Sequence, residues 1–341
     1  MVLPIIIVNY NNPADTIECI QSLLCLNNKD VVIILVDNSD DCGPVQTIKN
    51  WLNNPVKVET LSQIDTKHFD PNTKIAFSYF EDKDIGDILL KDYTGEVVII
   101  KTTNRGFAAA NNIALAALIK EDFPWIWLLN SDTVAPGNAV SLFKEKVTEL
   151  DTAVGLVANK LCYYHNPEIL QGLYGVYYPK YASSIHAYAW QKDKDVQEPI
   201  KLLKEFEYPI GASLFVKKEF VKDVGLMNEK FFLYFEEIDW VVRGNSKGWK
   251  AAFVSDVKVY HKEGASVKSG QKIKSLLADM YSIRNKLLMT ETYFKKYLPL
   301  VKISIILTIG NRFKRRQFER ARVMLKYFLT KKFDGPFKFN D

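Results

Sequence analysis

The chain has 341 residues, 48% hydrophobic and 25% charged, a composition that indicates a globular protein and excludes a disordered, fibrous or disulfide-stapled one. Its formal net charge of +5 is unevenly distributed. Residues 286–341 contain 14 Lys/Arg and 4 Asp/Glu, a net charge of +10, whereas residues 1–285 contain 31 basic and 36 acidic side chains. An acidic body with a basic end predicts that this end contacts an anionic partner.

The four cysteines form no CxxC pair and no regular framework. This spacing favours a reduced, cytoplasmic protein. The apolar start VLPIIIVNY lacks the basic residues of a signal peptide and turns polar at once, so we interpret it as a first strand.

The first 150 residues alternate between strand and helix patterns. Unbroken β-branched runs predict strands covered on both faces, and the segments between them have helical spacing of apolar residues. This alternation predicts a doubly wound, mostly parallel sheet. The interval from about residue 60 to 95 is polar and Gly/Pro-punctuated, and we expect it to lie outside the sheet. The expected strands are 4–10, 31–39, 96–102 and 125–132, and the expected helices are 14–26, 45–52 and 106–120.

The pattern after residue 150 is mixed and rich in tyrosine. We expect strands over 154–161, 211–220 and 250–261, a short helix over 236–248 and helical structure from Lys274 onwards.

Polar side chains follow three of the predicted strands, at Asn9, Asp37 and Asp132. Ligands of open α/β sheets bind at the carboxyl ends of strands, where a carboxylate can accept from a ribose or base or hold a cation. Each Asp alone could equally be a turn or helix-capping residue. The classical GxGxxG is missing after the first two strands, which argues against a dehydrogenase.

The segment TTNRGFAAANN opens a predicted helix, with Asn104 and Gly106 at its amino end. Helix N-termini attract phosphate through free amides and the helix dipole, so a diphosphate here, with a divalent cation on Asp132, makes electrostatic sense. The alternative is that Asn104 and Gly106 merely cap the helix.

The segment FFLYFEEIDW places Glu236, Glu237 and Asp239 among aromatic residues. On a helix beginning near Glu236, Arg243 shares a face with Glu236 and Asp239, which leaves Glu237 without a built-in partner. An unpaired carboxylate in apolar surroundings has a raised pKa and can act as a general base. The alternative is an acidic first turn that complements the helix dipole. His261 ends the strand DVKVYH and is either a second metal ligand or a structural histidine.

The segments IIIVNYN, LVDNSD, NRGFAAANN, LLNSD, GASLFVKKEF and FFLYFEEIDWVVRGNSKGW occur in the order found in glycosyltransferase family 2. Over residues 3–265 the chain resembles this family of inverting GT-A enzymes, and most of all the bacterial rhamnosyltransferases and related enzymes of cell-surface polysaccharide synthesis. The resemblance implies an α/β GT-A fold over 1–270, with a doubly wound nucleotide-sugar half (1–150) continuous with an acceptor and catalytic half (151–270), and it leaves 271–341 as a basic amphipathic helical tail.

The resemblance also implies roles for individual residues. Asp37 would contact the base or ribose, and Asn130 and Asp132 fall on the metal-binding DxD signature, with Asp132 and His261 as ligands of Mg²⁺ or Mn²⁺. Glu236 and Glu237 fall on the acidic pair whose second member is the general base. The donor-binding residues implied in this way, together with the first strand end, are Asn9, Asp37, Asn104, Gly106, Asn112 and Asn130.

Two positions depart from the family pattern. Asn130 is a neutral amide at the first position of DxD, and Glu237 stands where Asp is usual. One extra methylene moves a carboxylate by about an ångström, and misplacement on that scale can cost about 10²-fold in rate. Either the pocket compensates, or the base is Asp239.

The implied reaction moves a sugar from dTDP-rhamnose or a UDP-hexose to a saccharide acceptor, which we expect to be linked to a polyprenyl diphosphate. The Tyr and Trp residues of the second half would suit stacking on sugar faces. A nucleotidyltransferase that makes sugar nucleotides is the rival enzyme class, although NYNNPAD is not the Gly-rich basic loop that it requires. A non-catalytic sugar- or lipid-binding module on the same fold is the other alternative.

The apolar run KYLPLVKISIILTIG is too short to span a bilayer, which takes about 20 apolar residues. In the helix that follows, Phe318, Ala321, Met324, Leu325, Phe328 and Leu329 share one side, whereas Arg312, Arg315, Arg316, Arg320, Arg322 and Lys326 mostly occupy the other. This pattern predicts an interfacial helix on an anionic membrane, and hence a cytoplasmic protein that is peripheral on the inner face of the cell membrane. The alternatives are packing on the body or on a partner in a homodimer; no motif for nucleic acid accompanies the charge.

Overall fold

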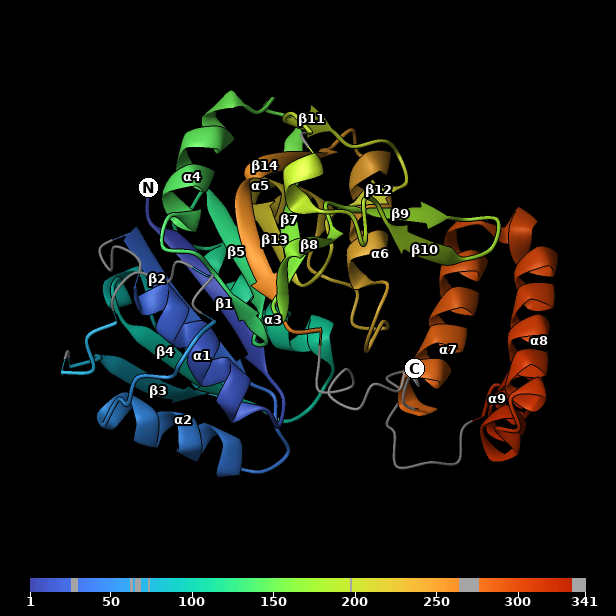
Figure 1. The fold of residues 1–341 in the computed structure, drawn as a ribbon, viewed down its shortest axis with the longest axis horizontal. Coiled ribbons are helices and arrows are strands. Elements are labelled where there is room, and N and C mark those ends of the chain that lie inside the picture. The colour runs from blue at the N-terminus through green and yellow to red at the C-terminus, as the bar shows by residue number, and fades with distance from the viewer. Residues whose placement is uncertain are drawn as a thin grey trace.

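The computed structural model describes residues 1–25, 30–61, 64, 69–72, 74–196, 198–263 and 276–332. An 11-stranded sheet forms its centre, in the order β11-β14-β7-β13-β5-β1-β2-β4-β3, with β6 paired to β14 and β8 to β7 (Figure 1). The parallel half consists of β1 (Leu3–Asn9), β2 (Val31–Asp37), β3 (Phe77–Glu81), β4 (Val97–Lys101) and β5 (Trp125–Asn130).

Helices cover both faces of this parallel half, as its unbroken apolar strands require. On β1, Ile6 faces the apolar core that contains the alanines of α3, whereas Ile5 and Ile7 face the core shared with α1, α2 and α4. The alternation follows from the two-residue period of a strand. The helices are α1 (Pro13–Leu24), α2 (Gly43–Asn53), α3 (Phe107–Leu118) and α4 (Ala139–Lys146), with short 3₁₀ turns η2 (Asp82–Asp87), η3 (Leu90–Tyr93) and η4 (Val147–Glu149).

The second half extends the same sheet through an antiparallel strand. The strand β13 lies between β5 and β7 and runs antiparallel to both, while β14 is parallel to β7. A separate sheet in the order β10-β9-β12 lies beside it. The elements are β6 (Thr133–Val134), β7 (Val154–Tyr163), β8 (Asn166–Gly172), β9 (Gly175–Tyr178), β10 (Ser183–His186), η5 (Asp193–Asp195), β11 (Lys201–Leu202), β12 (Glu207–Tyr208), β13 (Ser213–Lys217), α5 (Lys218–Val224), α6 (Glu236–Ser246) and β14 (Lys250–His261).

Two expectations about elements are wrong. Part of the interval expected outside the sheet, Phe77–Glu81, is the edge strand β3, whose half-buried aromatic side chains lack the apolar run of an inner strand. The strand expected over 211–220 ends at Lys217, and α5 begins at Lys218. The side chain of Lys218 is buried there, and its Nζ donates to the carbonyl of Glu121 at 3.0 Å.

Three helices follow the sheet: α7 (Leu276–Tyr293), α8 (Leu298–Lys314) and α9 (Phe318–Thr330), with the 3₁₀ turn η7 (Lys295–Tyr297) before α8. Helix α7 packs on the body and α8 lies on its far side (Figure 1). Lys274 and the boundary expected at residues 270/271 fall outside the described residues. None of the described helices is both long and apolar enough to cross a membrane.

The polar side of the tail differs from the expected one. Arg312 and Arg320, which the helical wheel places toward solvent, turn inward to the buried carboxylate of Asp279, at 2.8 and 3.3 Å. The reason is that a buried carboxylate must find cationic partners. On the apolar side of α9, Ala321 and Met324 are buried against the other tail helices.

Candidate functional site

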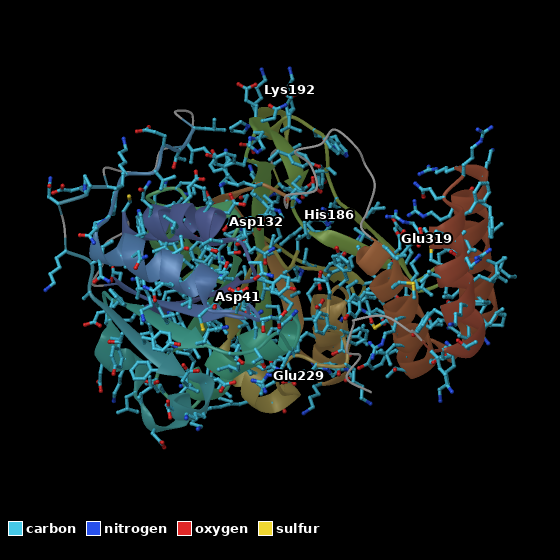
Figure 2. The ribbon with its side chains drawn as sticks, turned by 90° about the horizontal axis from the view of Figure 1, so that it is seen from below. Asp41, Asp132, His186, Lys192, Glu229 and Glu319 are labelled. Carbon is cyan, nitrogen blue, oxygen red and sulfur yellow. The ribbon has the colours of Figure 1, made fainter. Side chains whose placement is uncertain are left out.

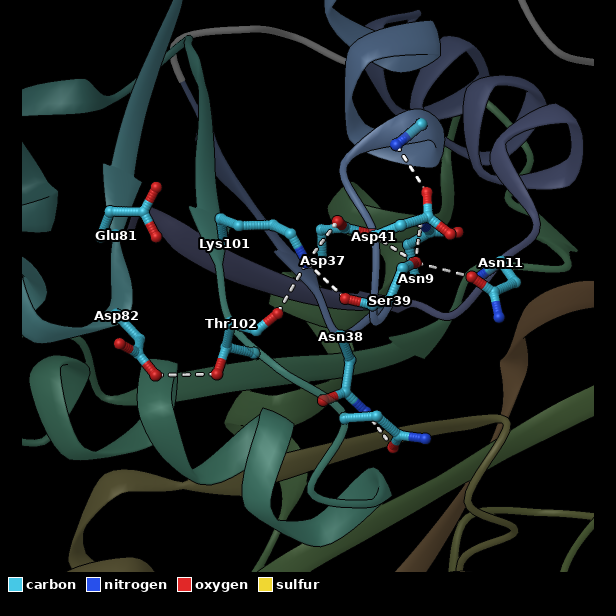
Figure 3. A network of polar contacts seen from close by, with 12 residues as sticks. Asn9, Asn11, Asp37, Asn38, Ser39, Asp41, Glu81, Asp82, Lys101 and Thr102 are labelled. Atoms are coloured by element: carbon cyan, nitrogen blue, oxygen red, sulfur yellow. Dashed lines mark hydrogen bonds and ion pairs between the residues drawn. The ribbon is translucent and has the colours of Figure 1, made fainter. Parts of the chain in front are cut away.

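The carboxyl edge of the parallel sheet carries a closed polar network (Figure 3). Asn9, Asp37 and Lys101 end three neighbouring strands in register. Asp37 has no exposed surface; it accepts from Asn9 Nδ2 at 2.6 Å and Ser39 Oγ at 2.8 Å, and lies 3.2 Å from Lys101 Nζ. Lys101 also donates to the carbonyls of Ser39 and Thr102. The carboxylate of Asp37 therefore neutralises a buried lysine, and a ligand would reach it only by displacing a protein group.

The amide groups at the start of α3 are occupied as well. The N–H of Arg105 donates to Asn38 Oδ1 at 3.2 Å, and that of Gly106 to Asn104 Oδ1 at 3.2 Å. The N–H of Phe107 donates to the carbonyl of Phe232 at 2.9 Å. The diphosphate expected at this helix start would therefore not find these three amides free.

The start of α3 instead contacts the segment between α5 and α6, residues 225–235. Gly106 has a φ of +92°, and a Cβ there would lie 2.6 Å from the carbonyl oxygen of Phe232, so only glycine fits. Asn112 Nδ2 donates to the carbonyl of Met227 at 2.9 Å, and the Met227 N–H donates back to Asn112 Oδ1 at 3.0 Å. The Asn112 amide also donates to Glu229.

Helix α7 holds the same segment from the other side. Tyr234 and Phe235, which directly precede α6, have φ values of +71° and +79°. Such left-handed conformations cost about 1–3 kcal/mol each in residues with bulky side chains and persist only where surrounding contacts impose them. The buried Asn285 supplies such contacts, because its Nδ2 donates to the carbonyls of Leu233 and Tyr234 at 2.8 and 2.9 Å.

The three acids at the start of α6 have different environments. Asp239 is fully buried and accepts from Arg243 Nε at 2.7 Å, Tyr293 Oη at 2.7 Å and Asn228 Nδ2 at 3.2 Å. Of the two acids that share a predicted helix face with Arg243, Glu236 and Asp239, the structure pairs it with Asp239. Since its carboxylate is buried and neutralised, Asp239 cannot approach an incoming hydroxyl, and the structure does not favour it as the base.

Glu236 and Glu237 lack cationic partners among the described residues. Burial first, and then the charge of Glu237, raise the pKa of Glu236 well above its usual range, and Glu236 Oε1 has no hydrogen-bond partner. Burial raises the pKa of Glu237 to about 7, although backbone N–H groups, including that of Gly211, favour the ionised form. Glu237 is half-buried, so its carboxylate can take up a proton near neutral pH and remains accessible.

Asp132 and His261 lie together, as the sequence predicts for a metal site. His261 Nε2 is 3.1 Å from Asp132 Oδ1, and its Nδ1 is 2.8 Å from Gln171 Oε1. Pairing of Thr133 in β6 with His261 in β14 brings the two side chains to one edge. In Figure 2 Asp132 lies near the centre of the view, to the left of His186.

The chemistry of this pair fits a divalent cation. With Gln171 Oε1 as the acceptor at Nδ1, Nε2 is the ring nitrogen of His261 that faces Asp132 Oδ1, and either a proton or a cation bridges these two atoms. Nearby in the chain, Asn130 Oδ1 is buried without a hydrogen-bond partner. A group of three or more His, Cys, Asp or Glu side chains suited to a metal is not found among the described residues, so other ligands would complete the shell.

Sequence reasoning missed four residues that order the site: Gln171, Lys101, Asn285 and Tyr293. Asn285 gave no signal, because it lies between Arg284 and Lys286 in a polar run. Gln171 and Lys101 gave none either, because a single polar residue at a strand end is ordinarily exposed. Tyr293 looked like one of many tyrosines.

A family model described as glycosyltransferase like family 2 matches residues 47–282. No curated protein sequence matches the chain. The crystal structure of GalNAc-T7 with UDP, GalNAc and Mn²⁺ is similar with a TM-score of 0.51 at 13% identity, over 87% of this chain and 49% of that chain. This chain therefore spans about half the length of that relative. The similarity shows a shared fold.

Two further solved structures are similar at lower scores. The mannosyltransferase PcManGT from Pyrobaculum calidifontis in complex with GDP-Man and Mn²⁺ has a TM-score of 0.47 and 12% identity, over 97% of this chain and 87% of that chain. S. aureus TarS has a TM-score of 0.47 and 11% identity, over 96% of this chain and 55% of that chain.

Proposed function

Because this chain belongs to glycosyltransferase family 2 and has a GT-A fold, we propose that it transfers a sugar from a nucleoside-diphosphate donor to a saccharide acceptor with inversion at the anomeric carbon. Inversion in one displacement requires a base that removes the proton of the incoming hydroxyl while the nucleoside diphosphate leaves from the opposite side of the sugar.

The observation that carries this proposal is the position of Glu237 among the three acids of α6. Asp239 is bonded to Arg243 and Tyr293, and Glu236 is almost fully buried, whereas Glu237 is half-buried and accessible. Burial also raises the pKa of Glu237 to about 7, which suits reversible proton uptake near neutral pH. Glu237 therefore accepts the proton of the acceptor hydroxyl.

Asp132 and His261 would hold a Mg²⁺ or Mn²⁺ ion, with the amide oxygen of Asn130 as a further donor. When bound, the ion stabilises the negative charge that develops on the leaving diphosphate. Gln171 keeps the proton of His261 on Nδ1 and so leaves Nε2 directed at Asp132. A GalNAc-T7 structure that contains UDP and Mn²⁺ shares the fold, which supports this assignment.

The donor would lie across the carboxyl edge of the parallel sheet, and dTDP-rhamnose and UDP-hexoses are the proposed donor classes. Asn9 and Asp37 act there through the network that fixes Lys101 and the backbone of Ser39. Asn104, Gly106 and Asn112 contribute by holding the segment that carries Glu237, since their polar groups are already bonded within the protein.

The acceptor would be presented at an anionic membrane, as for a saccharide on a polyprenyl diphosphate in cell-surface polysaccharide synthesis. On α8 the exposed side chains include Leu300, Ile303, Ile306 and Leu307, between 39% and 64% exposed. Exposed basic residues flank this apolar face at both ends of the helix, namely Lys295, Lys296, Lys314, Arg315 and Arg316. A flat apolar face between cationic ends suits a helix that lies in the headgroup region of a bilayer. The protein would then be peripheral on the inner face of the cell membrane.

The test of the donor site is titration calorimetry of UDP and dTDP, with and without Mn²⁺, on the wild type and on Asp132→Ala. We expect metal-dependent binding of one nucleotide that Asp132→Ala loses. Absence of binding to either nucleotide in the wild type would overturn the transferase assignment.

The test of the base is sugar transfer by Glu237→Gln, with Glu219→Gln, an exposed acid on α5, as the matched control. We expect kcat of Glu237→Gln to fall by about 10²–10⁴-fold with nucleotide binding preserved, because general-base catalysis contributes that much. The control should retain wild-type turnover. A fully active Glu237→Gln protein would remove Glu237 from the mechanism.

A further inference from the structure

A cavity of about 320 Å³ opens beside His261, on the side formed by β7, β8 and the end of β14. Tyr163 and Trp190 line one wall, and their rings stack with centroids 4.7 Å apart and planes inclined by 29°. Asn166, Lys262 and Glu263 also line it. The volume is that of a small-molecule site, and its lining is both aromatic and polar.

Trp190 is held in an unfavourable position. It is 68% exposed and has a φ of +69°, in the left-handed region that bulky residues rarely adopt. The turn is fixed by paired backbone bonds to β8, since the Trp190 N–H donates to the carbonyl of Leu170 and the Leu170 N–H to that of Gln191, both at 2.8 Å. A large exposed ring kept in a strained conformation indicates a binding role and not a packing role.

The chemistry of the walls selects the class of ligand. The exposed face of Trp190, whose other face stacks on Tyr163, offers a stacking surface for the apolar face of a pyranose, and the lining residues Asn166 and Glu263 offer donors and acceptors for hydroxyl groups. The exposed carboxylate of Glu263 would repel a phosphate group. The closed network of Asp37 and Lys101 lies at the ends of other strands, β2 and β4, so this cavity is separate from the edge assigned to the nucleotide.

We propose that the Tyr163–Trp190 platform is a saccharide subsite that binds a pyranose ring of the acceptor by stacking. The proposal rests on the proposed function for the identity of the acceptor, but the stacking itself requires no catalysis. His261 lines the cavity and contacts Asp132, so a sugar on the platform lies beside the proposed metal pair.

The experiment measures saturation transfer by NMR from the protein to four probes: the methyl pyranosides of glucose, galactose, N-acetylglucosamine and rhamnose. The variant is Trp190→Asn, since Asn removes the ring and tolerates a positive φ. Trp190→Phe keeps a ring, and Tyr181→Ala is the control, an aromatic residue 50% exposed that does not line the cavity. Thermal melts establish that each variant is folded.

We expect at least one pyranoside to bind the wild type, Trp190→Phe and Tyr181→Ala. Its affinity for Trp190→Asn should fall about tenfold while the melting temperature is equal or higher, the result of losing one stacking contact and relieving strain. Equal binding by Trp190→Asn, or no binding of any probe, would overturn the subsite. Saturation of uridine that depends on Trp190 would also overturn it, in favour of a base platform.

Calorimetry with UDP and dTDP on the same proteins separates this proposal from the proposed function. A wild type that binds the pyranoside but no nucleotide would retain the subsite and lose the transferase assignment. Nucleotide binding without Trp190-dependent pyranoside binding would retain the transferase assignment and overturn the subsite.

Discussion

Three carboxylates within four residues of one helix differ because each has different neighbours. Asp239 forms an ion pair with Arg243, Glu236 is buried with one oxygen that has no hydrogen-bond partner among the described residues, and Glu237 is half-buried with its pKa raised to about 7. The same functional group is thus held in an ion pair, buried, or left accessible with a raised pKa within one turn of helix.

The activity should follow the ionisation of Glu237. Below a pH of about 7 the carboxylate is protonated and cannot accept a proton, so kcat should fall by about tenfold for each pH unit. Above that pH, kcat should reach a plateau. The measurement is kcat at saturating donor and acceptor from pH 5 to 9, and a profile that stays flat between 5 and 7 would contradict the role of Glu237.

The local part of this arrangement could be predicted from the sequence, whereas contacts between residues far apart in the chain could not. Helical spacing alone places Arg243 on one face with Glu236 and Asp239 and leaves Glu237 off that face, although it does not tell which of the two acids Arg243 pairs with. The contact of Asp132 with His261 spans 129 positions and was reached through the family pattern. The occupied amides at the start of α3 could not be foreseen, since Phe232, which fills one of them, is far along the chain.

At the scale of elements, the segment between α5 and α6 is held by helices from both ends of the chain. Gly106 at the start of α3 lies against Phe232, Asn112 of α3 donates a hydrogen bond to Met227, and Asn285 of α7 donates one to Leu233. Ring stacking of Phe232 on Tyr281 of α7, with centroids 4.9 Å apart, adds to this hold. The strained residues before Glu236 are therefore imposed from outside the segment.

Asn285→Ala should release this segment. We expect the free energy of unfolding to fall by about 1–3 kcal/mol, since two partly buried carbonyls lose their donor. We also expect kcat to fall more than nucleotide affinity, since Glu237 is displaced. Urea unfolding and steady-state kinetics measure the two effects. Thr292→Ala, at an exposed position on the same helix, is the control and should change neither. An unaffected kcat in Asn285→Ala would show that α7 does not position the acidic helix.

The three tail helices meet at one buried acid. Asp279 on α7 pairs with Arg312 on α8 and with Arg320 on α9. Asp279→Asn leaves two guanidinium groups in a poorly solvated place, and breaking a buried pair in this way costs about 3–5 kcal/mol. We expect faster amide hydrogen exchange across 298–330, read by mass spectrometry. Lys331→Ala, which removes an exposed pair with Glu291, should change the exchange little, and similar exchange in both variants would contradict the assignment.

The elements themselves were predicted with uneven success. Inner strands such as β2 and β5 are unbroken apolar runs and were placed correctly, because burial on both faces leaves a strong pattern. The edge strand β3 and the small sheet of β9, β10 and β12 were missed, since short strands with half-exposed aromatics lack that pattern. The change from strand to helix at Lys218 was missed as well, because no Gly, Pro, Asn or Asp marks a turn there.

At the scale of the whole molecule, the basic residues of the tail and the exposed apolar side of α8 are expected to contact the same anionic membrane. Ile303→Asp with Leu307→Asp should abolish sedimentation with phosphatidylglycerol vesicles, because both side chains are more than half exposed on that face. Phosphatidylcholine vesicles should bind the wild type weakly, and salt should release it. A wild type that ignores anionic vesicles but elutes as a dimer disrupted by the same substitutions would assign the face to a second copy.

The hold of Asn285 on the segment before Glu236 also has a consequence for biosynthesis. Ribosomes add about 5–20 residues per second and domains begin to fold from their N-terminal side, so the parallel strands of the first 130 residues emerge first. The two hydrogen bonds from Asn285 to the backbone before Glu236 form only once α7 has been made. A nascent chain that ends before α7 therefore has the strands of its sheet but lacks the bonds that fix the start of its acidic helix.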